Sequence, residues 1–123
     1  MKIKNVDLYA CKEPLQNLMA RGDMPVKYGY PIAKLARKVL EEIAVIDETR
    51  NGLIKKFGTT DPKGMVKIEP ESENWNKFVV EYNELMTIDN ELPVKKVQLP
   101  DNINLPLSDL VTLDPFIEVV HVA

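Results

Sequence analysis

The residue types that most often carry out catalysis are scarce in this sequence. It has one histidine, His121, and one cysteine, Cys11. The carboxylate nearest to His121 along the chain is Glu118, and the β-branched tail around it favours a surface histidine over a general base. Lys12 would lower the pKa of the neighbouring Cys11 thiol, but an isolated cysteine on a helix is more often a small buried hydrophobe. We therefore expect no catalytic residues and no enzymatic activity.

Metal and cofactor sites are not indicated either. The 19 acidic residues include the pairs Glu41-Glu42 and Asp47-Glu48, which are typical of solvated faces. None of the acidic residues has the spacing of a calcium-binding loop, and the five glycines are isolated, so there is no glycine-rich phosphate loop. We expect no metal and no cofactor.

A small basic cluster is the first candidate interaction site: Lys34, Arg37 and Lys38. One hypothesis is a contact with nucleic acid, for which three cations without interleaved aromatic residues are a small signal. The other is pairing within the chain, since antiparallel packing of the two long helices would bring Lys38 close to Glu91. The cluster would then face an acidic group made of Glu81, Glu84, Asp89 and Glu91. We favour the internal pairing.

The element that positions this cluster is an amphipathic helix predicted over residues 31–57. Pro31 suits the first turn of a helix, and Gly58 suits a left-handed cap after its last residue. Apolar residues recur in this stretch at alternating spacings of four and three, which is typical of a helix that packs against a nearly parallel partner. They are Ile32, Ala36, Val39, Ile43, Ile46, Leu53 and Phe57.

Arg50 interrupts this apolar series and is the second candidate interaction site. It stands where the next apolar residue is due, between Ile46 and Leu53. Its stem should therefore lie along apolar surface while its guanidinium finds a partner, an arrangement that we favour slightly over full exposure. The partners within reach in an antiparallel pair are the rings of Trp75 and Tyr82 and the carboxylates of Glu48 and Glu81.

The partner helix is predicted over residues 73–88, with Ser72 as its N-cap. Its apolar residues also follow spacings of three and four, and we expect Trp75 and Phe78 to be mostly buried against the long helix. The connection between the two helices contains Asp61-Pro62-Lys63-Gly64, a type I turn sequence that predicts a small hairpin. An antiparallel helical pair is the simplest arrangement.

The rest of the chain predicts short elements around this pair. Residues 1–4 can form a strand, and Asn5 is a good N-cap for an N-terminal helix that Pro14 should kink or break. Residues 24–28 read as extended chain, residues 92–99 as a strand, and residues 108–113 and 115–118 as short helical turns. We expect an α+β fold in a single domain, 1–123, in which the helical pair and the N-terminal helix pack with a small sheet of short strands.

The C-terminal tail, residues 116–122, is the third candidate interaction site. Its apolar residues are poor material for a free end, so we expect it to dock as a strand on its own domain or on a second copy of the chain. Docking on a second copy would make a homo-oligomer. The candidate contact residues are Phe116, Ile117, Val119 and Val120.

Composition agrees with an ordinary globular protein, with 45% apolar and 28% charged residues. No apolar run approaches the roughly 20 residues needed to cross a bilayer, and the N-terminus lacks the apolar core of a signal peptide. A single free thiol suits a reducing compartment, so we expect a cytoplasmic protein that does not bind membranes. Residues 1–57 carry a net charge of +4 and residues 58–123 one of −7. We interpret this asymmetry as two halves that fold against each other.

Several short motifs are distributed over most of the chain: Met1-Lys2-Ile3-Lys4-Asn5, Asp7-Leu8, Pro25-Val26-Lys27, Ile32-Ala33-Lys34, Glu48, Arg50, Leu53, Lys56-Phe57-Gly58, Glu84-Leu85-Met86 and Leu113-Asp114-Pro115-Phe116-Ile117-Glu118. With these motifs the sequence resembles small proteins of unknown function from tailed bacteriophages that infect Gram-positive bacteria. The resemblance implies a viral setting, in the host cytoplasm or the virion, and no known activity. The first hypothesis is a non-enzymatic protein that contacts a phage or host protein, as an assembly factor, minor virion component or host-directed inhibitor. The alternative is a nucleic-acid-associated protein that uses the basic start of the long helix.

Overall fold

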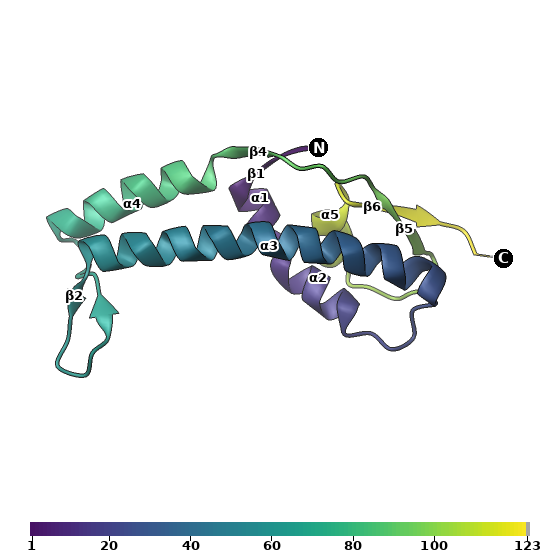
Figure 1. Ribbon diagram of the computed structural model, residues 1–123, viewed down its shortest axis with the longest axis horizontal. Helices are drawn as coiled ribbons and strands as arrows, with labels where there is room; N and C mark the ends of the chain where they lie inside the picture. The colour runs from purple at the N-terminus through teal and green to yellow at the C-terminus, as the bar shows by residue number, and fades with distance from the viewer. Residues whose placement is uncertain (123) are drawn as a thin grey trace.

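One helix of 32 residues, α3 (Val26–Phe57), runs most of the length of the molecule; the other helices lie beside it and a two-stranded hairpin projects from its C-terminal end (Figure 1). The computed structural model describes residues 1–122 and has the expected α+β fold. The shorter helices are α1 (Asn5–Ala10), α2 (Lys12–Met19), α4 (Glu73–Met86) and α5 (Leu107–Leu113).

The expected small sheet is instead three separate pairs of strands. The antiparallel pairs are β1 (Lys2–Lys4) with β4 (Asp89–Glu91) and β2 (Thr59–Thr60) with β3 (Val66–Lys67). The third pair is parallel and joins β5 (Val97–Pro100) to β6 (Ile117–Val120). The strand expected over residues 92–99 is therefore wrong as one element, because Pro93 cannot donate to a ladder and β4 and β5 pair with different partners.

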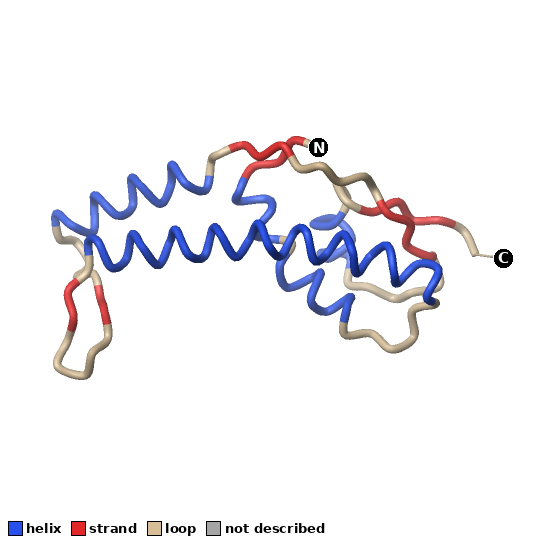
Figure 2. The backbone as a smooth tube through the Cα atoms, viewed as in Figure 1, coloured by secondary structure: helices blue, strands red, loops and turns tan. Residues whose placement is uncertain are grey.

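The core surrounds the N-terminal half of α3, where α1, α2, α5 and β5 pack (Figure 2). The predicted apolar series is confirmed there, with Leu35 as an additional member. The buried α3 residues are Ile32, Leu35, Ala36, Val39, Ile43 and Ile46. None of the α3 residues after Ile46 is fully buried. The apolar series therefore continues beyond the hydrophobic core, along the C-terminal half of α3.

The C-terminal half of α3 and the antiparallel helix α4 form a two-helix extension that we call the arm, residues 47–86 (Figure 1). The predicted helical pair is confirmed, but it covers only this half of α3. Leu85 is the one buried residue of α4, and Trp75 and Phe78 are half-buried rather than enclosed. The Ser72 cap is confirmed, since its Oγ accepts a hydrogen bond from the backbone N–H of Trp75 at 3.1 Å.

The N-terminal segment is broken as expected but is capped differently. Helix α1 ends before Cys11 and α2 begins after it, which places Pro14 in the first turn of α2, where a missing N–H costs no helical bond. The prediction of an Asn5 N-cap is wrong. Lys4 occupies that position, and Asn5 is the first helical residue, with its side chain turned into the protein.

Helix α3 begins at Val26, so the expected extended segment over residues 24–28 is helical in its second half. Pro25 precedes the first turn, and its carbonyl accepts hydrogen bonds from the N–H groups of Tyr28 and Gly29. Pro31 thus lies inside the helix rather than at its start. The fold tolerates it because Pro31 and Lys27 are exposed, so the Lys27 carbonyl that loses its helical donor can bind water.

The end of α3 at Phe57 is confirmed, but Gly58 has φ −90° and is not a left-handed cap. A side chain at Gly58 would meet the Ile54 carbonyl and would approach Val66 Cγ1 to 2.6 Å, so glycine is needed for the close approach of the hairpin. The predicted hairpin turn is confirmed by Gly64 at φ 83° and by the hydrogen bond from its N–H to the Asp61 carbonyl at 3.0 Å.

The short helix expected after residue 107 is confirmed as α5, whereas the helical turn expected over residues 115–118 is wrong. The chain turns through Asp114 and Pro115 and then enters strand β6. The N–H of Val97 donates to the Phe116 carbonyl at 2.9 Å, and the N–H of Asp101 donates to the Val120 carbonyl at 2.9 Å. Of the two docking modes expected for the tail, the structure has the strand on its own domain.

Candidate interaction surfaces

Cys11 is enclosed between α1, α2 and α5. Its thiol donates to the Asp7 carbonyl at 3.3 Å and lies 3.5 Å from the Thr112 carbonyl. Burial, and to a lesser degree the negative charge of Asp7, raises the pKa of the Cys11 thiol to about 11. A thiol with this pKa is almost entirely protonated at neutral pH and is a poor nucleophile.

Cys11 should therefore react much more slowly with a thiol reagent such as DTNB in the native protein than in guanidinium chloride. At about pH 8 a thiol with a pKa near 11 is about 0.1% thiolate, so we expect a rate at least ~100-fold below that of the unfolded chain. The measurement is the release of the coloured product over time. Equal rates in the two conditions would contradict the burial of this residue.

His121 lies near the chain end and holds the tail. Its Nδ1 is 2.9 Å from Asp101 Oδ2, and the N–H of Val122 donates to Asp101 Oδ1 at 3.1 Å. The hydrogen bond with His121, followed by that with Val122, lowers the pKa of the Asp101 carboxyl. The histidine ring is highly exposed, and within residues 1–122 no group of three or more metal-ligating side chains comes together.

Arg50 is partnered, as predicted, but the expected partners are wrong. Its Nη1 donates to Tyr9 Oη at 3.2 Å, its Nη2 lies 3.2 Å from Asp47 Oδ1, and its guanidinium is 5.9 Å from the centre of the Tyr9 ring. Arg50 therefore faces α1 rather than α4, where Trp75, Tyr82 and Glu81 lie. The sequence could not show this, because the direction of a side chain at the edge of an apolar series depends on which elements flank it.

Asp47 is the centre of this cluster, which joins α1 and α2 to α3. Its carboxylate accepts a hydrogen bond from Tyr9 Oη at 2.9 Å and lies 3.2 Å from Lys12 Nζ. Desolvation alone would raise the pKa of Asp47, but the hydrogen bonds from Tyr9 and Lys12 and the nearby charges of Lys12 and Arg50 outweigh it and lower the pKa. The cluster thus links α1 and α2 to α3 through hydrogen bonds and ion pairs that use the donors of Lys12 and Arg50.

Arg50→Ala and Arg50→Leu should both lower the melting temperature, and alanine should lower it more because it also loses the packing of the stem. The side chain is 33% exposed, so we expect a loss of about 1 kcal/mol in the free energy of unfolding for alanine. Arg37→Ala is the matched control, since Arg37 is exposed and makes only the 3.4 Å ion pair with Glu41. A stabilising Arg50→Leu, or no difference from the control, would contradict the cross-link.

The internal pairing expected for the basic cluster is wrong. Within residues 1–122 no ion pair joins the cluster to the acidic group of α4 and β4, Glu81, Glu84, Asp89 and Glu91. Glu91 binds the N-terminal amine at 3.2 Å and Asp89 lies 4.0 Å from Lys2. The reason is that the chain turns away from α3 at the end of α4, after Met86, and pairs with β1. The segment that returns to the start of α3 is residues 93–97, which carries lysines instead of carboxylates.

A shallow groove that we call the lysine groove separates the start of α3 from this returning segment. One part is lined by Lys34, Lys38 and Lys95, and the adjoining part by Lys27 and Lys96. Pro31 and Val97 line both parts, so the two parts adjoin. Sequence reasoning named Lys34 and Lys38 but missed the other three, and it placed Arg37 beside them, whereas Arg37 pairs with Glu41.

The four candidate residues of the tail are divided between the core and the surface. Phe116 is fully buried and Ile117 is 4% exposed, so their side chains belong to the hydrophobic core. Val119 is 53% exposed and Val120 is half-buried. Contact with a partner at this strand would therefore use Val119 and the exposed Glu118.

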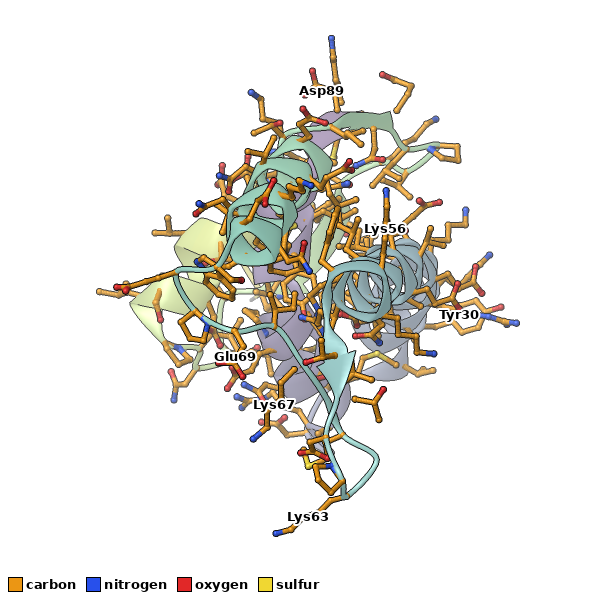
Figure 3. All side chains as sticks on the ribbon, turned by 90° about the vertical axis from the view of Figure 1, so that its left-hand side faces the viewer. Tyr30, Lys56, Lys63, Lys67, Glu69 and Asp89 are labelled. Carbon is orange, nitrogen blue, oxygen red and sulfur yellow. The ribbon has the colours of Figure 1, made fainter. Side chains whose placement is uncertain are left out.

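The arm carries a surface that sequence reasoning missed. The rings of Trp75 and Phe78 lie 5.8 Å apart, and those of Phe78 and Tyr82 lie 5.7 Å apart, in one row along α4. The first two rings border a pocket of about 400 Å³ between α3, α4 and the hairpin, which we call the arm pocket. Figure 3 views the molecule from this end, with Lys63 at the tip of the hairpin and Lys67 and Glu69 higher along it. The pocket is lined by Ile54, Val66, Lys67, Ile68, Pro70, Trp75 and Phe78.

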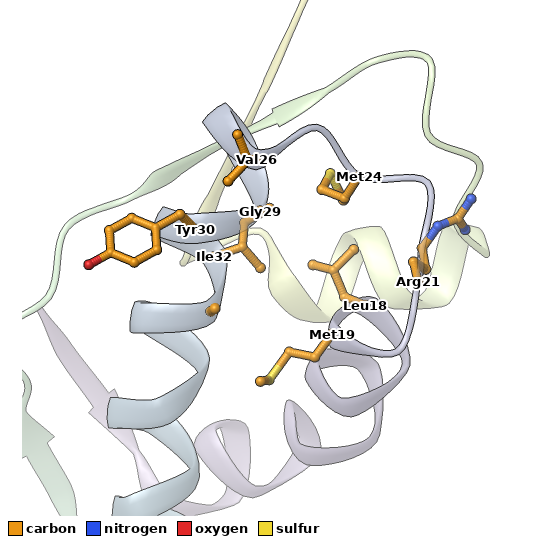
Figure 4. Close-up of a pocket in the computed structure, with 9 residues that line it drawn as sticks. Leu18, Met19, Arg21, Met24, Val26, Gly29, Tyr30 and Ile32 are labelled. Atoms are coloured by element: carbon orange, nitrogen blue, oxygen red, sulfur yellow. The ribbon is translucent and has the colours of Figure 1, made fainter.

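A second apolar pocket, of about 290 Å³, lies at the opposite end of α3 between the end of α2 and the first turns of α3 (Figure 4). Leu18, Met19, Met24 and Ile32 contribute apolar wall. Arg21 stands at its edge, but its guanidinium is already bound to Asp23 at 2.7 and 2.9 Å and to a backbone carbonyl at 2.6 Å. The pocket thus offers apolar surface without a free charged anchor.

Comparisons of the chain with protein-family models, with curated proteins and with solved structures find no match. The resemblance to phage proteins therefore stays a hypothesis based on the motifs of the sequence. Among the described residues, no helix combines the length and the apolar character needed to cross a bilayer.

Proposed function

We propose that this chain is a non-enzymatic bacteriophage protein that acts through protein–protein contacts, as an assembly factor, minor virion component or host-directed inhibitor. It would act in the host cytoplasm or in the virion. The basis for the viral setting is the resemblance of the short sequence motifs to proteins of tailed phages. The arm pocket is the single observation that supports contact with a protein.

The architecture of the arm explains why this pocket is suited to a partner. Two helices and a two-stranded hairpin form no enclosed layer, so Trp75, Phe78 and Tyr82 remain half-buried. Tryptophan and tyrosine are enriched among the residues that dominate binding energy at protein interfaces, and an anchor side chain from one partner usually fills a pocket on the other. With a volume of about 400 Å³ and mostly apolar walls, the arm pocket can accept such an anchor.

The two residues with the most reactive side-chain types support the non-enzymatic part of the proposal. The Cys11 thiol is buried with a raised pKa, and His121 holds the tail through Asp101. Neither lies at the arm pocket, whose only charged lining residue is Lys67.

The test is capture of proteins from nuclease-treated lysate of infected host cells with three forms of the protein. Ile68→Glu places a charge in the wall of the arm pocket, and Met65→Glu makes the same change at an exposed site on the same hairpin. We expect the wild type and Met65→Glu to retain the same discrete protein and Ile68→Glu to lose at least ~90% of it. Thermal melting of all three forms checks the fold.

Two results would overturn the proposal. One is a wild-type protein that retains nothing once nucleic acid is digested. The other is equal retention by the two glutamate variants, which would show that the arm pocket is not the contact.

A further inference from the structure

The lysine groove brings together five cations from two segments that are far apart in the sequence. Lys27, Lys34 and Lys38 come from α3, and Lys95 and Lys96 come from the chain that leads into β5. We propose that the lysine groove binds the phosphate backbone of a single-stranded nucleic acid. This inference is independent of the protein contact proposed for the arm, because the two surfaces lie at opposite ends of α3 (Figure 1).

The charges of the groove are not neutralised by carboxylates within the described part of the chain. None of the ion pairs formed within residues 1–122 involves any of its five lysines. The carboxylates next along this part of α3 are Glu41 and Glu42, and Glu41 is held by Arg37. Converging cations without counter-charges favour a polyanion, since neutralising phosphates releases the counterions condensed on the nucleic acid.

The dimensions of the groove suit several phosphates in a row. From Lys27 to Lys38 the helix rises about 16 Å, and together with the lysines of the opposite wall this length can accept several phosphates of one strand. The floor is apolar and includes Pro31, Leu35 and Val97. Helix α3 forms one wall of the groove. It does not project from the surface, as a helix that enters the major groove of a duplex would. This arrangement favours a single strand as the ligand.

Tyr28 lines the groove, and Tyr30, which borders the apolar pocket on the neighbouring face of α3, lies beside Lys34; both provide rings on which bases can stack. Tyr28 lines the part of the groove that contains Lys27, and the Lys27 ammonium lies 5.6 Å from the centre of its ring. Tyr30 is 63% exposed and its ring lies 5.5 Å from the Lys34 ammonium. A basic groove beside aromatic rings is the combination that sequence-tolerant single-strand binders use.

The test is fluorescence anisotropy with a dye-labelled oligothymidylate of about 20 nucleotides, titrated with protein over a range of salt concentrations. Neutralisation of four or five phosphates predicts a slope of about −3 in log K against log salt, since each contributes about −0.7. Lys34→Glu combined with Lys95→Glu should weaken binding at least ~10-fold at low salt, by repulsion at the centre of the groove.

The matched control is Lys55→Glu combined with Lys56→Glu, which makes the same charge change on exposed residues near the far end of α3. The affinity of this control for the oligonucleotide should stay within ~2-fold of that of the wild type, because charges more than a Debye length away from the groove are screened. A milder double variant, Lys34→Gln with Lys95→Gln, removes two charges and should reduce the magnitude of the salt slope by about 1.4. It keeps the test valid if the glutamate variant fails to fold. Melting curves compare the stability of all forms.

Four results would overturn the inference: no binding by the wild type, equal losses in the groove and control variants, a duplex of the same length that binds more tightly than the strand, or polyglutamate of the same length that binds as tightly. The last result would identify an acidic polypeptide as the ligand of the groove.

Discussion

Phe116→Ala is expected to lower the free energy of unfolding by about 3–5 kcal/mol, because it removes a fully buried aromatic side chain and leaves a cavity. The residue stands where the chain turns from α5 into β6. Its N–H donates to the Leu113 carbonyl at 2.8 Å, and its carbonyl accepts the hydrogen bond from Val97. Denaturation in urea, followed by circular dichroism, measures the change.

Val119→Ala is the control on the same strand. Its side chain is 53% exposed, so we expect a loss of no more than about 0.5 kcal/mol. The comparison separates two roles that the sequence left open for the tail. A Phe116→Ala variant as stable as Val119→Ala would contradict the core role and would return Phe116 to the candidate contact residues.

Asn5→Ala is expected to destabilise the protein by about 1–3 kcal/mol, because it leaves buried polar groups without partners. The Asn5 residue is 5% exposed. Its Nδ2 donates to the Leu85 carbonyl near the end of α4 at 2.8 Å, and its Oδ1 accepts a hydrogen bond from Asn90 Nδ2. Alanine removes both of these side-chain bonds, which add to the pairing of β1 with β4, and thermal melting measures the effect.

The variant Asn5→Asp adds a pH dependence to this test. A buried carboxylate would replace the donor to Leu85 with an acceptor, so its folded-state pKa should rise above the unfolded value of about 3.9. The loss of stability should therefore be full above the raised folded-state pKa and should be relieved as the pH falls toward 4, where the protonated acid can donate. The control is Asn74→Ala, because Asn74 is an exposed asparagine on α4. An Asn5→Ala variant with the same melting temperature as this control would contradict the role of the Asn5 hydrogen bonds.

The sequence by itself determined the elements whose stability depends on neighbours along the chain. The end of α3 at Phe57, the Ser72 cap and the turn from Asp61 to Gly64 follow from local chemistry, which is readable over three or four residues. The helical period of the apolar residues also gave the buried face of α3. The break near Pro14 followed in the same way, because the proline ring fixes φ and removes the N–H donor whatever the tertiary structure.

Local rules failed where a competing element was present. Asn5 is a good N-cap in isolation, but its amide is used at the end of α4, a partner 80 residues away in the chain. Pro31 was taken as a helix start because proline suits a first turn, although Lys27, Lys34 and Lys38 at helical spacing indicate that its face of α3 is exposed to water. Gly58 was expected in a left-handed conformation, yet a glycine is needed there because a side chain would meet both the Ile54 carbonyl and Val66 of the hairpin.

Both candidate surfaces were decided by the tertiary structure alone. The lysine groove exists because the chain leaves α3 at the end of α4, pairs with β1 and returns with Lys95 beside Lys34, and that path depends on long-range pairing of β1 with β4. The arm pocket exists because only α4 and a short hairpin cover the last turns of α3. A helical periodicity of apolar residues predicts that one face of a helix will be covered. The number of elements that cover this face depends on how the whole chain packs.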